Sequence, residues 1–494
     1  MHDHRPHPRT RPRLLRPGRS VLAALATALL ASACAVGPDY VRPELPVQQR
    51  FVRATAATPA PMPAADAGFW HRFDDPLLDR LVEEALLANH DLRIALARYD
   101  RANALLRGAG FDRFPTVTAQ ATASDSRASA GQMPGATRAE RDVRSSEAGI
   151  VASWELDLFG RVRRGVEASR ADTAASAADL AAVQVAIVGE VANGYLGLRG
   201  LQERLRVARA NADNQRETLR LVDARFDAGR GTAFDTSRAR AQLETTLARL
   251  PALEAEIATT MHRLAVLTGR TPDALVALLE APTGLPTVPA RPAAGTPGEL
   301  LRRRPDVIAA EQRLHAATAR IGVATADLFP RFTLGGLLGS HALEGSSLFE
   351  RDSETRLVAL GIDWSFLDVG RVRARIAAAD ADAAGELARY EQAVLRALED
   401  TENALVRSSR AREEDAHLQR AAADSAHAAE LARIRFEAGA ADLFEVLDAE
   451  RTQLQAQDAF AAARTRSATS AVALYRAMAG GWPSRLPQRP QPRQ

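Results

Sequence analysis

The chain has 494 residues, of which 46% are hydrophobic and only 5% aromatic. This length far exceeds what one small core requires, and abundant alanine with few aromatic residues favours long, closely packed helices over a compact globular core. The 64 basic side chains, all arginine, nearly balance the 61 acidic ones, for a net charge of +3. Residues 1–33 hold six Arg and one Asp, a net +5, so the remainder is near −2 and gives no basis for nucleic-acid binding.

Residues 1–33 have the features of a lipoprotein signal peptide. Six arginines precede an apolar stretch, Val21 to Ala33, which is too short to span a bilayer and ends in small residues. The next residue, Cys34, is the only cysteine and cannot form a disulfide within the chain. The pattern predicts that Cys34 becomes the lipidated N-terminus, whereas the alternative is an ordinary signal peptide followed by an incidental thiol. Beyond Cys34 we expect no run of the ~20 apolar residues that a membrane helix needs.

Helical and strand patterns then alternate along the chain. Residues 34–70 are rich in Pro, Ala and Thr and are expected to form an extended tether. Apolar residues at helical spacing predict helices over 75–110 and 305–326. After each helix the pattern changes to strict alternation of apolar and polar residues, which predicts strands over 117–123, 150–158, 332–338 and 360–366. Alternation is typical of transmembrane barrel strands, although a soluble half-buried hairpin gives the same pattern.

Very long helices follow each pair of strands. Proline is absent from residues 135–250 and again from 331–482. In the first stretch, apolar and small residues recur about every 3.5 positions, which predicts one helix over 161–228 with a length of about 100 Å. A return helix is expected over 232–268, with a local bend at Pro251. No compact domain needs a helix of that length, whereas a tunnel or a strut does.

The sequence is internally duplicated. Trp154-Glu-Leu-Asp-Leu-Phe-Gly-Arg-Val-Arg recurs 210 residues later as Trp364-Ser-Phe-Leu-Asp-Val-Gly-Arg-Val-Arg, and Asp112-Arg-Phe-Pro recurs 215 residues later as Asp327-Leu-Phe-Pro. Repeats of this length are duplicated domains rather than short solenoid units. The predicted organisation is a signal peptide (1–33), a lipidated tether (34–70), a first repeat (71–270), a Pro-rich linker (271–299), a second repeat (300–482) and a disordered tail (483–494).

Four strands per chain cannot close a barrel. Unpaired backbone amides in a bilayer cost several kcal/mol each, so strands that enter a membrane require partners from other copies. Three copies would supply twelve strands, and two copies with eight strands would also close.

Four segments resemble one known family. The segment from Cys34 to Pro43 (Cys-Ala-Val-Gly-Pro-Asp-Tyr-Val-Arg-Pro) and Phe69-Trp70 followed by Phe73-Asp-Asp-Pro-Leu are similar to NodT-type outer-membrane factors. The two Arg-Phe-x-Ala-Gly turns resemble the tips of TolC-like channels. The resemblance implies an α+β membrane protein that forms a homotrimeric channel-tunnel, with a twelve-stranded barrel and a long helical periplasmic barrel. It further implies that the protein acts as the exit duct of a tripartite efflux pump of the resistance–nodulation–division type. Such a duct exports drugs or small toxic metabolites with a periplasmic adaptor and an inner-membrane transporter.

The resemblance also implies a gate at the periplasmic end. Glu445 and Asp448 are three residues apart and therefore share a helix face, beside Phe444. At the 210-residue offset, Asp235 corresponds to Glu445 but Arg238 corresponds to Asp448, so Arg238 could pair with a gate carboxylate. A threefold ring of these acids would attract cations, whereas an ordinary solvated helix face is the alternative.

Two further sets of residues are singled out, the first by the resemblance and the second by its position in the predicted strands. The tips that meet the adaptor would be formed by Arg225, Gly229, Arg435 and Gly439, although simple helix ends would have the same sequence. Trp154 and Trp364 stand near equivalent strand ends, as aromatic residues at a membrane interface do.

We expect neither an enzyme nor a cofactor, apart from the covalent lipid on Cys34. The ten histidines are scattered, and neither a phosphate-binding loop nor a metal-ligand spacing is present in the sequence. Two other functions remain open: a type I secretion outlet, and a lipid-anchored periplasmic coiled-coil scaffold with soluble hairpins.

Overall fold

The computed structural model describes residues 35–44, 48–53, 68–290 and 295–478. The predicted signal peptide, Cys34 and the predicted tail lie outside the described residues. The helices are α2 (Pro76–Ala88), α3 (His90–Phe111), α4 (Arg161–Asp227), α5 (Ala233–Leu247), α6 (Arg249–Leu267), α7 (Val276–Leu279), α8 (Pro297–Leu301), α9 (Pro305–Ala326), α10 (Val369–Glu437) and α11 (Leu443–Ala477). The strands are β1 (Thr116–Arg127), β2 (Asp142–Leu156), β3 (Arg331–Ala342) and β4 (Glu354–Asp363), and short 3-10 turns begin at Phe69, Ala139, Gly345 and Arg351.

The chain divides into two compact units. Of the described residues, unit 1 comprises those in 35–41, 104–171 and 314–385, and unit 2 comprises those in 42–103, 172–313 and 386–478. Each unit therefore takes segments from both predicted repeats, and α3, α4, α9 and α10 contribute residues to both.

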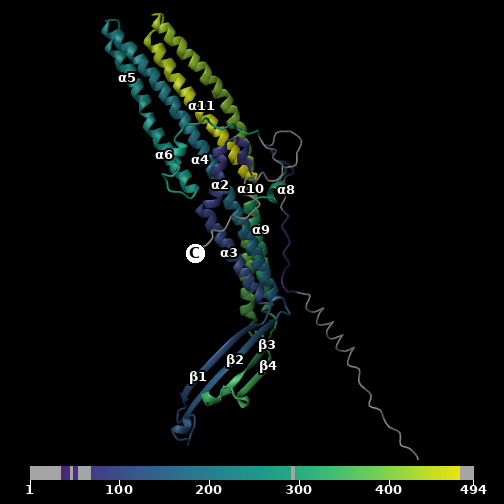
Figure 1. Ribbon diagram of the computed structural model, residues 1–494. Coiled ribbons are helices and arrows are strands. Elements are labelled where there is room, and N and C mark those ends of the chain that lie inside the picture. The colour runs from purple at the N-terminus through teal and green to yellow at the C-terminus, as the bar shows by residue number, and fades with distance from the viewer. Residues whose placement is uncertain (1–34, 45–47, 54–67, 291–294, 479–494) are drawn as a thin grey trace, which may run out of the picture. The chain divides into compact units, whose positions relative to one another are not determined.

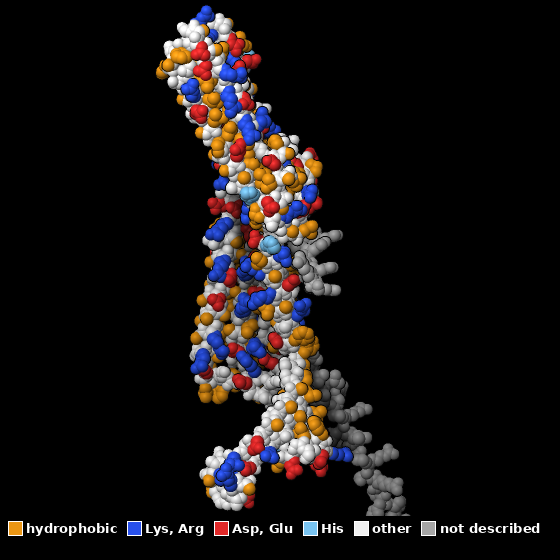
Figure 2. Space-filling view, turned by 60° about the vertical axis from the view of Figure 1, so that its left-hand side comes forward, with side chains coloured by type: hydrophobic (Ala, Val, Ile, Leu, Met, Phe, Trp, Pro, Cys, Tyr) orange, Lys and Arg blue, Asp and Glu red, His pale blue; other side chains and the backbone are white. Residues whose placement is uncertain are grey.

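Unit 1 is built on a four-stranded antiparallel sheet in the order β1-β2-β3-β4 (Figure 1). Residues directly opposite one another share a face of an antiparallel sheet. One face is apolar, with Ile150 opposite Leu338 and Leu334 opposite both Trp154 and Leu360. Large apolar side chains on this face are exposed, for example Ile362 at 63% and Leu338 at 59%. In the view of Figure 2, hydrophobic side chains gather along the strands and charged ones at the loop-bearing end.

All four predicted strands are present, but their boundaries differ from the predictions: β1 and β3 each end four residues later, at Arg127 and Ala342, and β4 begins six residues earlier, at Glu354. Strand β2 begins at Asp142, eight residues earlier than predicted, because its polar first half pairs with β1 without showing an alternating pattern. Strand β4 covers Glu354–Asp363. Residues 364–366, which were predicted to end this strand, are not part of it in the single chain, so this part of the prediction was wrong. In β2, the equivalent residues 154–156 pair only with β3. Residues 364–366 have no corresponding partner strand in the described part of the chain.

Unit 2 consists of long antiparallel helices, with α4, α5–α6, α10 and α11 side by side in Figure 1. Ion pairs and hydrogen bonds join these helices along their length, including Arg204 to Asp458 at 2.7 Å and Gln242 to the Leu447 carbonyl at 3.0 Å. The largest buried cluster includes residues of α2, α4, α6 and α11, and Phe69 stacks on Tyr475 within it at 4.9 Å. Helix α4 ends one residue before its predicted end, and α9 has its predicted bounds.

Two predicted helices are each divided in two, for different local reasons. Asn89 has an extended backbone between α2 and α3, and its side chain accepts from the Leu92 amide and donates to the Leu267 carbonyl. An asparagine with this geometry starts a new helix, because it satisfies an amide that the first turn leaves free. The predicted bend near Pro251 is the boundary between α5 and α6 at Ala248, since proline cannot donate to the carbonyl four residues earlier.

One described helix meets the length and composition criteria of a membrane span, contrary to our expectation for the chain beyond Cys34. An 18-residue window of α4 has a mean hydropathy of 1.4, and 44% of it is buried. Core helices meet the same criteria, so this window is weak evidence for a span.

Candidate gate at the helical turns of unit 2

Two turns of the same construction join the long helices to their return helices. Gly229 and Gly439 end α4 and α10 with φ of +70° and +76°, a left-handed conformation that glycine adopts without steric cost. In both turns the amide after the glycine donates to the carbonyl of the preceding arginine, Arg225 or Arg435, at 2.8 Å. The two Arg-x-x-x-Gly sequences therefore form equivalent helix C-caps.

The first turn of each return helix is capped by an acidic or hydroxyl side chain. Thr232 and Asp235 form a reciprocal capping box at the start of α5. At the start of α11, Asp442 accepts from the Glu445 amide at 2.9 Å. The carboxylate of Asp235 is thus occupied in capping its own helix.

The two predicted gate carboxylates each pair with an arginine of the second repeat. Glu445 lies 3.2 Å from Arg435, and Asp448 lies 2.5 Å from Arg451. Both acidic side chains are nearly half exposed. The structure thus places Glu445 and Asp448 on the exposed surface of the first turns of α11, with their charges compensated within the chain.

Arg238 does not form the contact considered from the sequence. Within the chain, its guanidinium carbon lies 4.7 Å from the centre of the Phe444 ring, in a cation–π arrangement. Phe444 is 53% exposed, and the contact joins α5 to α11. Arg238 and Phe444 are brought together, but not as an ion pair.

The equivalent phenylalanines of the two turns have different environments. Phe436 is buried, and Arg225 reaches it from α4: Nη2 donates to the Phe436 carbonyl at 2.6 Å, and the guanidinium lies 3.9 Å from the ring centre. Phe226, its counterpart in the first repeat, is 44% exposed. Arg225 therefore fastens α10 to α4 directly beneath the turns.

A buried carboxylate in this region was not identified from the sequence. Glu450 of α11 is 1% exposed, accepts from the Thr218 hydroxyl at 2.6 Å, and lies 3.5 Å from Arg433 of α10. Burial raises the pKa of the Glu450 carboxyl, against the opposing effects of Thr218 and Arg433. The sequence contained a usable indication, because Glu450 lies in the helical register of the apolar residues Leu443, Val446, Leu447 and Leu454.

Trp154 and Trp364 occupy equivalent positions in unit 1. The indole nitrogen of Trp154 donates to the Arg113 carbonyl, and that of Trp364 donates to the Leu328 carbonyl, both at 3.0 Å. Each tryptophan thus fastens a strand end to the turn that precedes the neighbouring strand. An amphipathic ring with its polar atom satisfied suits a membrane interface.

The segment that follows Cys34 is held firmly against unit 1. The buried side chain of Arg164 donates to the carbonyls of Val36 and Gly37 and to Asp39. Gly37 has φ of +90°, and a Cβ there would stand 2.4 Å from Gly322 Cα. Only glycine fits this approach, so the first described residues are positioned by specific contacts.

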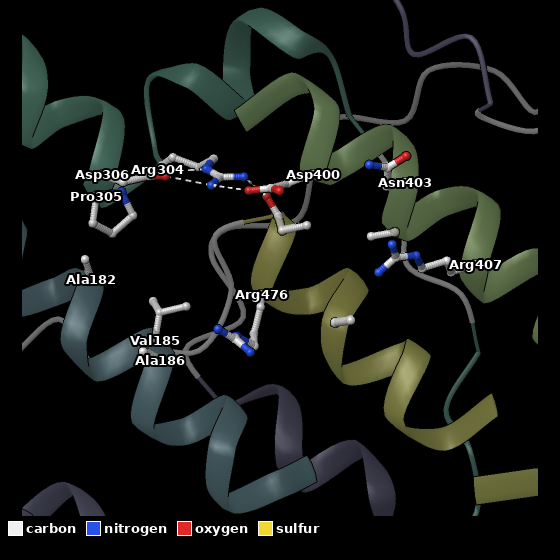
Figure 3. A pocket seen from close by; sticks show the side chains of 13 residues that line it. Ala182, Val185, Ala186, Arg304, Pro305, Asp306, Asp400, Asn403, Arg407 and Arg476 are labelled. Atoms are coloured by element: carbon white, nitrogen blue, oxygen red, sulfur yellow. Dashed lines mark hydrogen bonds and ion pairs between the residues drawn. The ribbon is translucent and has the colours of Figure 1, made fainter. Parts of the chain in front are cut away.

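A hollow of about 400 Å³ in unit 2 is lined by α4, α9, α10 and α11 (Figure 3). Arg304 pairs there with Asp306 at 2.6 Å and Asp400 at 3.1 Å, and donates to the carbonyls of Ala397 and Ala477. Its charge and its donors are therefore used in joining the end of α11 to α9 and α10. Among the described residues, no group of three or more His, Cys, Asp or Glu side chains is arranged to hold a metal ion.

Comparisons with known proteins agree on one family. The family model described as outer membrane efflux protein matches residues 81–270 and 296–480. Outer membrane protein OprJ of Pseudomonas aeruginosa is 34% identical over 472 residues, covering 93% of this chain and 96% of that protein. Nodulation protein T of Rhizobium leguminosarum bv. trifolii is 30% identical over 432 residues, covering 86% of this chain and 89% of that protein.

Solved structures show the same architecture. The outer-membrane channel OprN superposes with a TM-score of 0.85 at 43% identity, covering 91% of this chain and 100% of that one. The open state of the MtrE channel of Neisseria gonorrhoeae superposes with a TM-score of 0.80 at 28% identity, covering 91% and 99%. The predicted channel-tunnel fold is confirmed by these similarities.

Proposed function

The chain belongs to the outer membrane efflux protein family, and from that premise we propose that it is the gated exit duct of a tripartite efflux system. It passes drugs or small toxic metabolites outward without catalysing a reaction, and the energy comes from an inner-membrane transporter reached through a periplasmic adaptor. The observation that carries the proposal is the sheet of unit 1, whose apolar face is exposed over four adjacent strands.

An exposed face of this kind suits a lipid bilayer. Transmembrane barrel strands alternate between lipid-facing apolar and lumen-facing polar residues. Opposite the apolar face, β1 presents Thr118, Gln120 and Thr122, and β2 presents Ser153 and Glu155. A row of apolar residues, Val151, Leu337 and Leu357, interrupts this polar surface. A soluble scaffold protein would have to leave the apolar face in water, so the sheet favours the duct over the scaffold.

The assembly follows from the strands. We propose a homotrimer in which three copies supply a twelve-stranded barrel, because an open sheet edge is not tolerated in a bilayer. The repeats 71–270 and 300–482 contribute equivalent hairpins and helices to it, joined by the linker 271–299. The turns at Gly229 and Gly439, with Arg225 and Arg435, meet the adaptor.

We propose that Cys34 is lipidated and anchors the chain in the outer membrane. The contacts of Arg164 with Val36, Gly37 and Asp39 support this, because they hold the residues just after Cys34 in a fixed position. The signal peptide 1–33 is removed in this proposal, and the tether that begins at Cys34 ends before Phe69, which together with Trp70 is buried in the core of unit 2.

For the gate, we propose that Glu445 and Asp448 from three copies ring the constricted end of the tunnel. Phe444 lies beside the ring, and Asp235 and Arg238 stand on the neighbouring turn. The pairs Glu445–Arg435 and Asp448–Arg451 support a closed, charge-compensated state, and opening would expose carboxylates that attract cations.

Single-channel conductance in planar bilayers tests the duct and the gate. Wild-type protein is expected to give discrete cation-selective openings, and Glu445→Gln/Asp448→Asn is expected to lose the selectivity. Asp213→Asn/Glu217→Gln is a matched control, because it removes two exposed acids of α4 that are likewise paired with arginines. Openings unchanged by the gate variant would refute the gate, and protein that never conducts would refute the duct.

A further inference from the structure

The joint at the end of α11 has a counterpart in the first repeat. Arg304 donates to the carbonyl of Ala477, the last residue of α11, and Asn89 donates to the carbonyl of Leu267, the last residue of α6. The two donors are 215 residues apart and the two acceptors 210, which are the offsets of the duplication. Both repeats therefore hold the end of their return helix with one buried polar side chain.

Two further arginines stand beside this joint in the second repeat alone. Arg407 of α10 and Arg476 of α11 line the hollow next to Arg304, and the residues 210 positions earlier are Gly197 and Val266. Neither Arg407 nor Arg476 has a hydrogen-bond or ion-pair partner among the described residues. The first repeat makes its joint without either charge, so these two arginines are not needed to hold the helix ends together.

The charges that line the hollow do not cancel. The lining carries three arginines, at 304, 407 and 476, against Asp306 and Asp400. Arg304 pairs with both aspartates, so the excess positive charge lies on Arg407 and Arg476, which extend from different helices in Figure 3. Guanidinium groups donate charge-assisted and often bidentate hydrogen bonds to carboxylate, sulfonate or phosphate oxygens. Two of them without protein partners around one hollow therefore favour an oxyanion as ligand.

The side chain of Arg476 is positioned by close packing against α4. Gly189 of α4 is buried, and a Cβ added there would overlap Cδ of Arg476 and stand 2.6 Å from its Nε. Any larger residue at 189 would displace the arginine. Ala182 and Val185 of the same helix line the hollow as well, together with Ala473 of α11. A ligand would therefore meet apolar surface beside the positive charge.

We propose that this hollow binds a small amphipathic organic anion. Its carboxylate, sulfonate or phosphate head is held by Arg407 and Arg476, and its apolar body lies against Ala182 and Val185. The volume of about 400 Å³ is within the usual range for sites that bind small molecules. All the lining residues belong to one chain and to unit 2, so the proposal goes beyond the exit duct and does not depend on the assembly or on the gate.

Titration calorimetry with naphthalene-2-sulfonate tests the site, using the full chain in an uncharged detergent and the detergent alone as background. The sulfonate is expected to bind at least about tenfold more tightly than naphthalene-2-sulfonamide, which has the same rings and no charge. Arg407→Gln and Arg476→Gln should each weaken sulfonate binding by about tenfold, and added salt should weaken it further in wild type. Arg396→Gln is the matched control, because Arg396 is an exposed arginine of α10 outside the hollow. Val185→Phe should reduce binding by filling the hollow without changing a charge.

The outcomes distinguish this site from general charge effects and from the duct. Weaker binding in Arg407→Gln, Arg476→Gln and Val185→Phe, with Arg396→Gln unchanged and every variant folded by circular dichroism, supports the proposal. An affinity that is unchanged in both hollow variants, or lowered equally in Arg396→Gln, refutes it. Equal affinity for the sulfonamide refutes recognition of the anion, and a wild-type chain that binds no sulfonate at millimolar concentration refutes the site. None of these results depends on conductance, which tests the duct separately.

Discussion

The hydroxyl of Thr218 donates a 2.6 Å hydrogen bond to the carboxylate of Glu450, linking α4 to α11 inside the helical unit. Arg433 of α10 lies 3.5 Å from the same carboxylate, so one buried side chain of α11 contacts two other helices. The second oxygen of Glu450 has no hydrogen-bond partner in the structure, which makes its ionised form costly.

Replacing Glu450 is expected to change how stability depends on pH. Because burial raises its pKa in the folded state, the folded chain binds this proton more tightly than the unfolded chain. That contribution to stability is complete below the ordinary pKa of a glutamic acid and is lost as the pH rises through the raised value. Glu450→Gln should therefore resist heat better than wild type at pH 8, with a smaller or reversed difference at pH 4. Thermal unfolding followed by circular dichroism checks this, with exposed Glu413→Gln as the control; a difference that does not vary with pH contradicts it.

Replacing glycine by alanine should have opposite effects on the stability of the protein at two positions of α4. A Cβ at Gly200 would meet Thr465 Oγ1 at 2.0 Å and Cβ at 2.8 Å, whereas a Cβ at Gly197 meets nothing within 4 Å. Rotation of Thr465 cannot move its own Cβ, so α4 and α11 must separate in Gly200→Ala, at a cost of about 1–3 kcal/mol. Gly197→Ala should stabilise by about 0.5–1 kcal/mol, because alanine favours the helix. Denaturant unfolding of both variants measures the contrast, and equal effects would show that the close approach is unimportant.

Phe51 is expected to anchor residues 48–53 to unit 2. Its ring is 3% exposed among Leu300, Leu405 and Leu474, and the next two amides donate to Glu402 at 2.7 and 3.1 Å. Phe51→Ala should weaken this docking by about 3 kcal/mol and expose the bonds after Arg50 and Arg53 to trypsin. Val52→Ala is the control, because Val52 is exposed. Cleavage at equal rates in both variants would contradict an anchoring role for the ring.

Two arginines lining the same hollow should differ in their effect on stability. Arg304→Met removes the partner of Asp306 and Asp400 and two donors to backbone carbonyls, and should cost about 2–4 kcal/mol. Arg407→Met at the exposed side should stay within about 0.5 kcal/mol of wild type. The temperature at which the purified protein unfolds gives the comparison. An Arg407 effect as large as that of Arg304 would indicate that the hollow, rather than the ion pairs, matters for stability.

The sequence predicted the long helices well because their determinants are local. Proline-free stretches and a 3.5-residue period specify α4, and Pro305 marks the first residue of α9. The break at Asn89 was not predicted, because it depends on a hydrogen bond to the carbonyl of Leu267, 178 residues away. The first half of β2 was missed for a related reason: its residues become a strand through pairing with β1 rather than through their own alternation.

The candidate gate was predicted only in part. Spacing placed Glu445 and Asp448 on one helix face, and the turns at Gly229 and Gly439 have the geometry that glycine suggests. Spacing cannot show which arginine each acid contacts, since Arg435 approaches Glu445 across a turn and Arg238 lies on Phe444 from another helix. Recognising that Glu450 is buried required knowledge that the apolar residues around it on α11 are covered by other helices.

The β1–β2 and β3–β4 hairpins pair in the same register, and this agreement indicates how the chain arose. Two strand pairs that match residue for residue across offsets of 215 and 210 are what remains when one gene is copied and fused to itself. An ancestor of half the length would have had one hairpin and one turn of this kind. Fusion then freed one half to diverge from the other: Arg238 now stands where Asp448 stands, and Phe226 is exposed where Phe436 is buried. The present chain can therefore change each of its two turns independently, which a chain of half the length with a single turn could not.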